Sequence, residues 1–194
     1  MGTRDVILDA AARVIAERGL ANVTTRQIAQ TAGFTEAALY KHFTNKADLL
    51  VAVMRERSPG FTLLARALNG RAGTGTLLDN LTGVARAAIT FYGEGFPMLA
   101  SIFADPATLA AHKEELRQQG AGPHKANEAV AAYLRTEQDL GRLRSEVDTT
   151  AAAGLLLGAC FQHAFLSHMA SPSGSDDGEA AASFARTLLQ QLAR

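Results

Sequence analysis

The feature that most constrains the fold is a series of short, capped helical segments near the N-terminus. Thr24 and Gln27 have the T-x-x-Q spacing of a capping box, in which two side chains satisfy free backbone amides at a helix start. This helix is predicted to end at Gly33, because glycine readily adopts the positive φ of a sharp turn. Thr35 and Asn45 are predicted to cap the next two helices. The stretch therefore predicts a compact helical unit without strands.

The rest of the chain is also predicted to be helical. Alanine and leucine, both strong helix formers, are abundant, and the alternating runs typical of strands are missing. A helix from Thr76 is expected to be interrupted by glycine and proline at residues 93–97. We therefore predict an all-α fold, with a three-helix head at residues 1–46 that contains a helix-turn-helix and a helical-bundle body at residues 47–194.

Composition excludes several classes of protein. The single cysteine, Cys160, excludes an intrachain disulfide framework and suits a reducing compartment. The N-terminus lacks the pattern of a signal peptide. A helix at residues 149–170 is about long enough to span a bilayer, but it contains Gln162 and His163, which are costly in lipid. We expect a cytoplasmic protein without a membrane span.

The charge distribution permits nucleic-acid contact without arguing strongly for it. The chain is neutral overall, and residues 1–57 carry a net charge of +2 against −2 in the remainder.

The second and third helical segments have the arrangement of a helix-turn-helix, whose second helix enters the DNA major groove. Phe34, Leu39 and Phe43 are predicted to face the core of the head. The side left free for DNA carries Thr35, Glu36, Ala37, Tyr40 and Lys41. The backbone amides after Asn45, together with Lys46, are suited to hold a phosphate.

Residues 24–49, TTRQIAQTAGFTEAALYKHFTNKADL, resemble the DNA-binding head of the tetracycline-repressor (TetR) family. The resemblance is carried by TTR, the AG turn, LY, HF and NK in that order, and it covers closely only the first quarter of the chain. Residues 140–159 are similar to the run into the dimerisation helices of many members. The resemblance implies phosphate contacts by Thr25, Tyr40, His42 and Lys46, and positions near bases for Arg26, Glu36 and Ala37.

Glu36 is an unusual residue for this position. A carboxylate near DNA repels phosphate unless it accepts a hydrogen bond from cytosine N4 or orients Lys41 or Arg26. The operator sequence therefore does not follow from these residues.

The body contains aromatic residues that could line an apolar pocket for a small-molecule effector. The alternative is that they belong to the core, as most apolar aromatic residues at helical spacing do. The candidates for ligand contact are Phe91, Tyr92, Phe96, Phe103, Tyr133, Phe161 and His163.

Cys160, His163 and Ser167 share one helix face at i, i+3 and i+7. No second cluster of His and Cys completes a metal set, and no acidic residue on that helix orients His163. We therefore predict no metal site, no catalytic site and no cofactor, and interpret these residues as polar groups of a pocket or interface.

The helix at residues 149–170 is apolar on nearly all sides and must be covered on all sides. One side carries Gly154, Gly158, Phe161 and Phe165. The other carries Leu156, Cys160, His163 and Ala164. If the body covers only one side, a second copy is needed for the other, which predicts a homodimer through residues 149–170 and 179–193.

These observations together predict a homodimeric transcriptional regulator. It would be a repressor bound to a palindromic double-stranded DNA operator and released by a small, mostly apolar ligand. One alternative is a helix-turn-helix DNA-binding protein whose body binds another protein instead of an inducer. A helical-bundle enzyme is a further alternative, but it needs a convergent set of titratable groups that the sequence does not supply.

Overall fold

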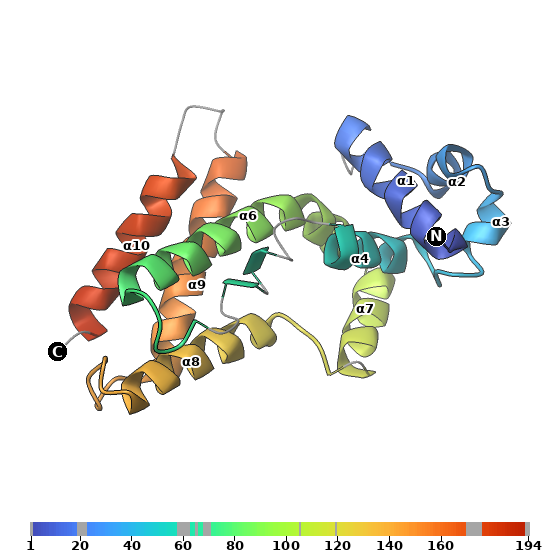
Figure 1. Ribbon diagram of the computed structural model, residues 1–194. Coiled ribbons are helices and arrows are strands. Elements are labelled where there is room, and N and C mark those ends of the chain that lie inside the picture. Colours follow the sequence, from blue (N-terminus) through green and yellow to red (C-terminus); the bar gives the residue numbers. More distant parts are fainter. Residues whose placement is uncertain are drawn as a thin grey trace. The chain divides into compact units, whose positions relative to one another are not determined.

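The computed structural model describes residues 2–18, 23–57, 63–64, 66–67, 71–104, 106–118, 120–169 and 176–192. Within these ranges all regular secondary structure is helical, which confirms the all-α prediction (Figure 1). The helices are α1 (Thr3–Arg18), α2 (Thr25–Ala32), α3 (Glu36–Leu39), α4 (Lys46–Arg57), α6 (Leu77–Ala104), α7 (Pro106–Gln118), α8 (His124–Asp139), α9 (Thr149–Met169) and α10 (Asp177–Leu192).

Packing divides the chain into two compact units. The head unit comprises Met1–Pro59 and Gly95–Gln119, and the body unit comprises Gly60–Glu94 and Gly120–Arg194. The head unit thus includes the end of α6 and all of α7 in addition to the N-terminal helices. The domain boundary predicted between residues 46 and 47 stays a prediction.

The N-terminal core of the head unit is apolar and forms between α1, α2, α3 and α4. α1 packs against both α2 and α4, and α2 packs against α3. The buried side chains are those of Ile7, Leu8, Ala11, Val14, Val23, Ile28, Ala29, Leu39, Phe43, Leu49, Ala52 and Val53.

The short helices of the head are held by the caps that the sequence predicts. The Thr24 Oγ1 accepts from the Gln27 amide at 3.2 Å, and the Gln27 Oε1 accepts from the Thr24 amide at 3.0 Å. Gly33 ends α2 at φ 77°. The Thr35 Oγ1 accepts from the Ala38 amide at 3.2 Å. These caps satisfy backbone groups that a two-turn helix would otherwise leave unpaired.

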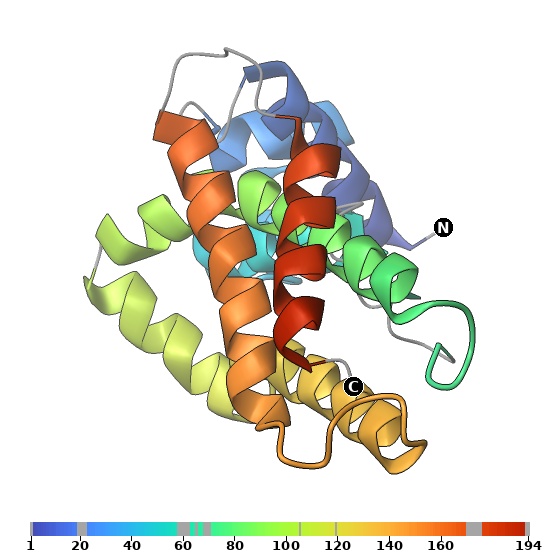
Figure 2. The ribbon, with the colours of Figure 1, turned by 90° about the vertical axis from the view of Figure 1, so that its left-hand side faces the viewer.

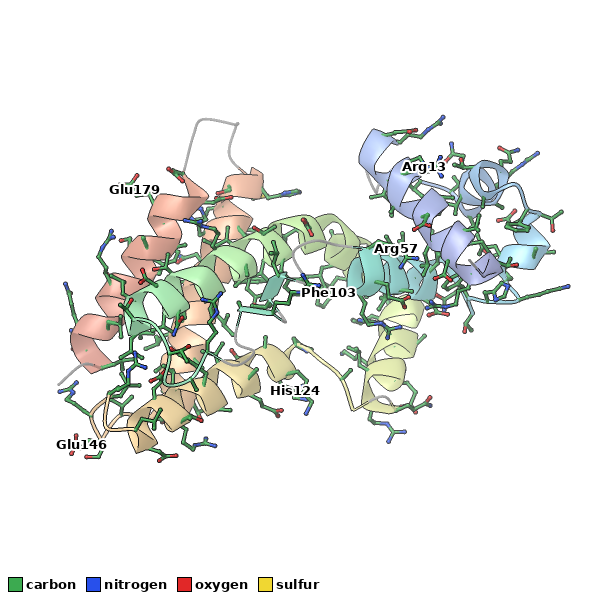
Figure 3. The ribbon with its side chains drawn as sticks, in the orientation of Figure 1. Arg13, Arg57, Phe103, His124, Glu146 and Glu179 are labelled. Carbon is green, nitrogen blue, oxygen red and sulfur yellow. The ribbon has the colours of Figure 1, made fainter. Side chains whose placement is uncertain are left out.

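Ion pairs fix the far end of α4 to α1. Arg4 forms a bidentate pair with Glu56, at 2.8 and 2.7 Å, and its guanidinium lies 5.4 Å from the centroid of the Phe43 ring. Arg57 reaches back to Asp9 at 2.6 Å and Asp5 at 3.2 Å (Figure 3). Because α1 and α4 are joined by both a core and these pairs, they form one rigid part of the head unit.

The body unit has its own apolar core. α9 packs against α8 on one side and α10 on another, and Figure 2 shows α9 and α10 running side by side. The core also includes the part of α6 that belongs to this unit. Its largest fully buried side chains are Leu81, Leu134, Leu143 and Leu156.

α9 has a covered face and an open face in the body unit. Leu156, Cys160 and Ala164 are buried, so the side that the sequence grouped with them is the covered one. The large apolar side chains on the open face are Leu155 (68 % exposed), Phe161 (43 %), Phe165 (44 %), Leu166 (55 %) and Met169 (71 %).

α9 is also, by length and composition, the one described helix that could cross a membrane. The core helix of a soluble protein passes the same test, and packing against α8 and α10 buries 39 % of the apolar stretch of α9.

A buried polar network anchors residues 71–76 to α8. The Glu137 side chain is fully buried; its Oε1 accepts from the Gly73 amide at 3.0 Å. Its Oε2 lies 3.1 Å from Arg142 Nη1, a charge contact without the geometry of a hydrogen bond. Asn80 Nδ2 donates to the Tyr133 hydroxyl at 3.1 Å and to the Thr74 carbonyl at 2.8 Å.

Two local predictions are wrong. α6 continues through residues 93–97 instead of breaking there, since burial of its apolar residues outweighs a cost of about 1 kcal/mol for each glycine and about 3 kcal/mol for Pro97. Phe34, predicted to lie in the core, is 37 % exposed, because the turn after Gly33 directs it to the rim of the head.

Candidate DNA-binding surface

The open edge of the helix-turn-helix is formed by the first turn of α3. Thr35 caps this helix, and its side chain and that of Ala37 are exposed. Leu39 and Phe43 are buried, so the helix is held from behind by the core, as predicted. A rigid helix end with small exposed side chains is suited to approach base edges in a major groove.

Three side chains behind this edge form a chain of hydrogen bonds. The Tyr40 hydroxyl donates to Thr25 Oγ1 at 3.3 Å, and the Thr25 hydroxyl donates to Glu36 Oε1 at 2.5 Å. Tyr40 is 45 % exposed, whereas Thr25 is 8 % exposed. The structure therefore brings together three of the predicted contact residues, from the start of α2 and both ends of α3.

Cationic side chains flank the same surface. Arg26, Lys41 and His42 are exposed and Lys46 is partly exposed. Among the described residues, Arg26, Lys41 and Lys46 form no ion pair, in contrast to Arg4 and Arg57. Unpaired cations are available to neutralise phosphates.

The turn before α4 is built as a reciprocal cap. The Asp48 amide donates to Asn45 Oδ1 at 2.8 Å, and the Thr44 amide donates to Asp48 Oδ2 at 2.7 Å. This fixes the helix start that carries the partly exposed Lys46, and a fixed helix N-terminus with a nearby cation is suited to bind an anion.

The predicted ligand residues do not form one group. Phe91, Tyr92 and Phe161 are neighbours in the body unit: the Phe91 and Tyr92 rings are 5.5 Å apart, and the Tyr92 and Phe161 rings meet edge to face at 5.3 Å. Burial raises the pKa of Tyr92. Phe96 and Phe103 belong to the head unit, and Phe103 is 65 % exposed.

Tyr133 lies in the buried polar network rather than beside the other aromatic side chains. It is 5 % exposed, and burial raises the pKa of its hydroxyl to about 12. Its partners Asn80 and Glu137 were not identified from the sequence. Glu137 lies among polar residues and Asn80 follows Asp79, and no short-range motif marks either side chain as buried.

His163 is paired rather than free. Its Nε2 lies 2.9 Å from Asp177 Oδ1, and its ring meets Phe184 edge to face at 5.9 Å. Burial raises the pKa of Cys160 to about 12, which keeps its thiol protonated and inert. Among the described residues no group of His, Cys, Asp and Glu could hold a metal ion.

Two surface cavities lie away from the predicted ligand residues. One, of about 340 Å³, lies between residues 144–148 and the facing ends of α9 and α10. The other, of about 350 Å³, lies between the first turn of α4 and α7 and includes His112, whose Nδ1 is buried without a hydrogen-bond partner. Neither is lined by any of the seven aromatic or histidine candidates.

Comparison with known proteins extends the likeness over both units. HTH-type transcriptional regulator TtgR of Pseudomonas putida is 43 % identical over 65 residues, which span 34 % of this chain and only 31 % of that relative. SmeT, the repressor of the Stenotrophomonas maltophilia multidrug efflux pump SmeDEF, matches 100 % of this chain and 92 % of its own at a TM-score of 0.66 and 23 % identity. It has also been solved with triclosan.

The transcriptional regulator FadR of Bacillus subtilis, solved in complex with stearoyl-CoA, matches 95 % of this chain and 96 % of its own at a TM-score of 0.66 and 19 % identity. These structural matches show the fold. Residues 7–53 match the bacterial regulatory proteins of the tetR family, and residues 81–191, more than half of the chain, match the C-terminal domain of AefR-like transcriptional repressors. The chain is a helix-turn-helix transcriptional regulator of the TetR family with an AefR-like C-terminal domain.

Proposed function

We propose that the protein is a homodimeric repressor that binds a near-palindromic operator and is released from it by a small, mostly apolar molecule. The observation that carries the proposal is the exposed first turn of α3, flanked by cations that have no ion-pair partner among the described residues. As a DNA-binding regulator, it acts in the cytoplasm.

The DNA contacts divide into base contacts and phosphate contacts. Arg26, Glu36 and Ala37 are proposed to lie at base edges, where an arginine bound to guanine contributes about 1–3 kcal/mol of discrimination. The phosphate contacts are proposed for Thr25, Thr35, Tyr40, Lys41, His42 and Lys46.

The dimer is proposed to form through the open face of α9 together with α10. Five large apolar side chains of α9 are at least 43 % exposed there, and Gly154 and Gly158 on the same face allow close approach of a second helix. A twofold interface of this kind presents the same surface on both copies.

The dimer is tested by matched substitutions. Leu166 on α9 and Leu140 after α8 are both 55 % exposed. Leu166→Glu is expected to give a monomer in sedimentation, because two carboxylates would be buried at the interface, whereas Leu140→Glu is expected to remain a dimer. A dimeric Leu166→Glu protein would contradict this arrangement.

The effector site is proposed for the body unit near Phe91, Tyr92 and Phe161, where aromatic rings cluster. The similar structures of SmeT and FadR have been solved with triclosan, which is apolar, and with stearoyl-CoA, which carries a long apolar acyl chain. Repression requires the two heads to reach half-sites about one DNA turn apart, roughly 34–36 Å. A ligand that prefers another separation weakens DNA binding through linkage.

The central experiment is selection of bound duplexes from a random pool by the purified protein. We expect enrichment of an inverted repeat. On that duplex, Lys46→Ala should weaken binding and reduce the slope of log K against log salt by about 1, since one phosphate contact is lost. Lys113→Ala, an exposed lysine of α7, is the control and should change neither. Equal effects of the two substitutions would contradict the proposed surface.

The alternative that the body binds another protein is favoured by the packing of Tyr133 in the polar network. It is also favoured by the two cavities described above, whose linings include none of the seven candidate ligand residues. Thermal unfolding with triclosan as the probe separates the two. A rise in melting temperature together with release of the operator supports an effector site, and an unchanged operator complex across a panel of apolar compounds supports the alternative.

A further inference from the structure

The hydrogen-bond chain at the head fixes the direction of two hydroxyl protons. A carboxylate has no proton to give, so the Thr25 hydroxyl must donate to Glu36 Oε1 across their 2.5 Å contact. The Thr25 oxygen is then free only to accept, and it accepts from the Tyr40 hydroxyl at 3.3 Å. Both hydroxyl protons therefore point along the chain toward Glu36.

A DNA phosphate oxygen, like a carboxylate, has no proton to donate and can only accept a hydrogen bond from a hydroxyl group. A threonine or tyrosine that holds a phosphate must donate its single proton to it. Thr25 and Tyr40 cannot donate to a phosphate while they donate along the chain to Glu36. The Glu36 carboxylate thus competes with DNA phosphate for the same donors, and its negative charge repels that phosphate as well.

We propose that Glu36 acts as a selectivity gate for DNA: it withholds the Thr25 and Tyr40 hydroxyls from phosphate until a base amino group in the major groove draws its carboxylate away. This rests on the proposed function, in which the same surface binds an operator. Cytosine N4 is the natural partner of a carboxylate in the major groove. The partly exposed side chain at the first position of α3 lies on the edge that faces the groove in the proposed complex.

The gate favours specificity over affinity. On an operator with a cytosine opposite Glu36, the carboxylate gives up its hydrogen bond from Thr25 and accepts one from cytosine N4. The Thr25 and Tyr40 hydroxyls can then donate to phosphates. On other sequences Glu36 either keeps the hydroxyls or turns away without a partner, and both outcomes weaken binding. Rejecting the wrong partner through an unpaired charge is a recognised route to discrimination.

The test compares Glu36→Ala, Glu36→Gln and Glu17→Ala on the selected operator and on a random-sequence duplex of the same length. Glu17 is an exposed acid of α1 and controls for the change in net charge. Glu36→Ala should bind the random duplex about tenfold more tightly, since one or two hydroxyl–phosphate bonds become available. Its affinity for the operator should change less, so that the ratio of the two affinities falls. Glu17→Ala should change both affinities by less than about twofold.

Glu36→Gln gives a second readout if the alanine variant is poorly folded. Glutamine pairs with adenine N6 and N7, so repeating the selection should replace cytosine with adenine at one position of each half-site and leave the other positions unchanged.

Tyr40→Phe tests the direction of the protons. In the otherwise native protein, Tyr40→Phe should lower the affinity for the random duplex only slightly. Combined with Glu36→Ala, it should lower that affinity several-fold more.

The outcomes separate this inference from the function on which it rests. If Lys46→Ala abolishes binding but Glu36→Ala behaves like Glu17→Ala, the gate is wrong and the DNA-binding function stands. A Tyr40→Phe penalty that is the same with and without Glu36 also overturns the gate. If no variant, including the native protein, binds any duplex, both proposals fail.

Discussion

The head and the body use their polar side chains in opposite ways. In the head, Arg26 and Lys41 are exposed and unpaired among the described residues, next to a helix end that the core holds rigid. In the body, Asn80 and Glu137 are 3 % and 0 % exposed and are bonded to neighbouring backbone and side chains. The candidate DNA-binding surface of the head therefore keeps polar groups for a partner, whereas the buried polar groups of the body specify its own fold.

The sequence distance of the contacts also differs. At the candidate DNA-binding surface of the head, the capping partners Thr24 and Gln27 are three residues apart, and Thr25 and Glu36 are eleven apart. Long-range pairs in the head, such as Arg4 with Glu56, join α1 to α4. In the body, the bond from Gly73 to Glu137 joins residues 64 apart. Contacts between residues a few positions apart can be recognised in a sequence, whereas contacts between residues far apart in the sequence cannot.

The largest effect is expected at Cys160 in the body. The thiol is fully buried, with its pKa raised to about 12, and the thiolate is the reactive form. Labelling with iodoacetamide at pH 8 should be at least about a thousandfold slower in the native protein than in concentrated urea, because the body must open first. Labelling at the unfolded rate would show that the body core is not closed around this residue.

The next largest effect is expected from the buried network. Glu137→Ala should lower the free energy of unfolding by about 3 kcal/mol, since it leaves the Gly73 amide unsatisfied and Arg142 without its carboxylate. Glu137→Gln keeps an acceptor and should cost less. Glu179→Ala, at an exposed acid of α10, should cost under about 0.5 kcal/mol. Urea unfolding followed by circular dichroism measures all three, and equal values would contradict a structural role for the network.

The contrast explains what the sequence predicted. The helices of the head, the caps at Thr24 and Thr35 and the buried positions of Leu39 and Phe43 follow from rules that act over three or four residues. The two faces of α9 follow from helical periodicity in the same way. The break predicted in α6 is wrong because burial of the surrounding apolar residues outweighs the local preferences of glycine and proline.

Polar side chains in the body were not predictable in this way. The aromatic character of Tyr133 predicts a pocket residue. In the structure its hydroxyl accepts a hydrogen bond from Asn80, which is 53 residues away. The sequence predicts no acidic partner for His163 because no acidic residue lies on α9. Its partner in the structure, Asp177, comes from α10. The link between Thr25 and Glu36 also required the structure, although both residues were already identified as candidate DNA contacts.

A smaller effect is expected from acid at the head. Arg4 and Arg55 hold the pKa of Glu56 at about 2, below the ordinary value of 4.5. The stabilisation is complete above about pH 4.5 and is lost as the pH falls toward 2, where the carboxylate becomes protonated in the folded state. We expect a loss of about 2 kcal/mol over this range, after allowance for the 25 % exposure of this side chain. Glu56→Gln should flatten this part of the pH dependence, and an unchanged pH profile would show that the pair contributes nothing.

The smallest effect is expected at the capping box of α2, and it tests whether the head depends on local contacts. Thr24→Ala should cost about 1 kcal/mol in the free energy of unfolding, because the Gln27 amide loses its acceptor, and Thr24→Ser should restore most of it. Thr24 precedes Thr25 and Arg26, so operator affinity should fall only as far as α2 becomes less well ordered. If Thr24→Ala left stability unchanged but abolished operator binding, Thr24 would itself be a DNA contact. The head would then differ from the body in the placement of its polar groups and not in the range of the contacts that hold it.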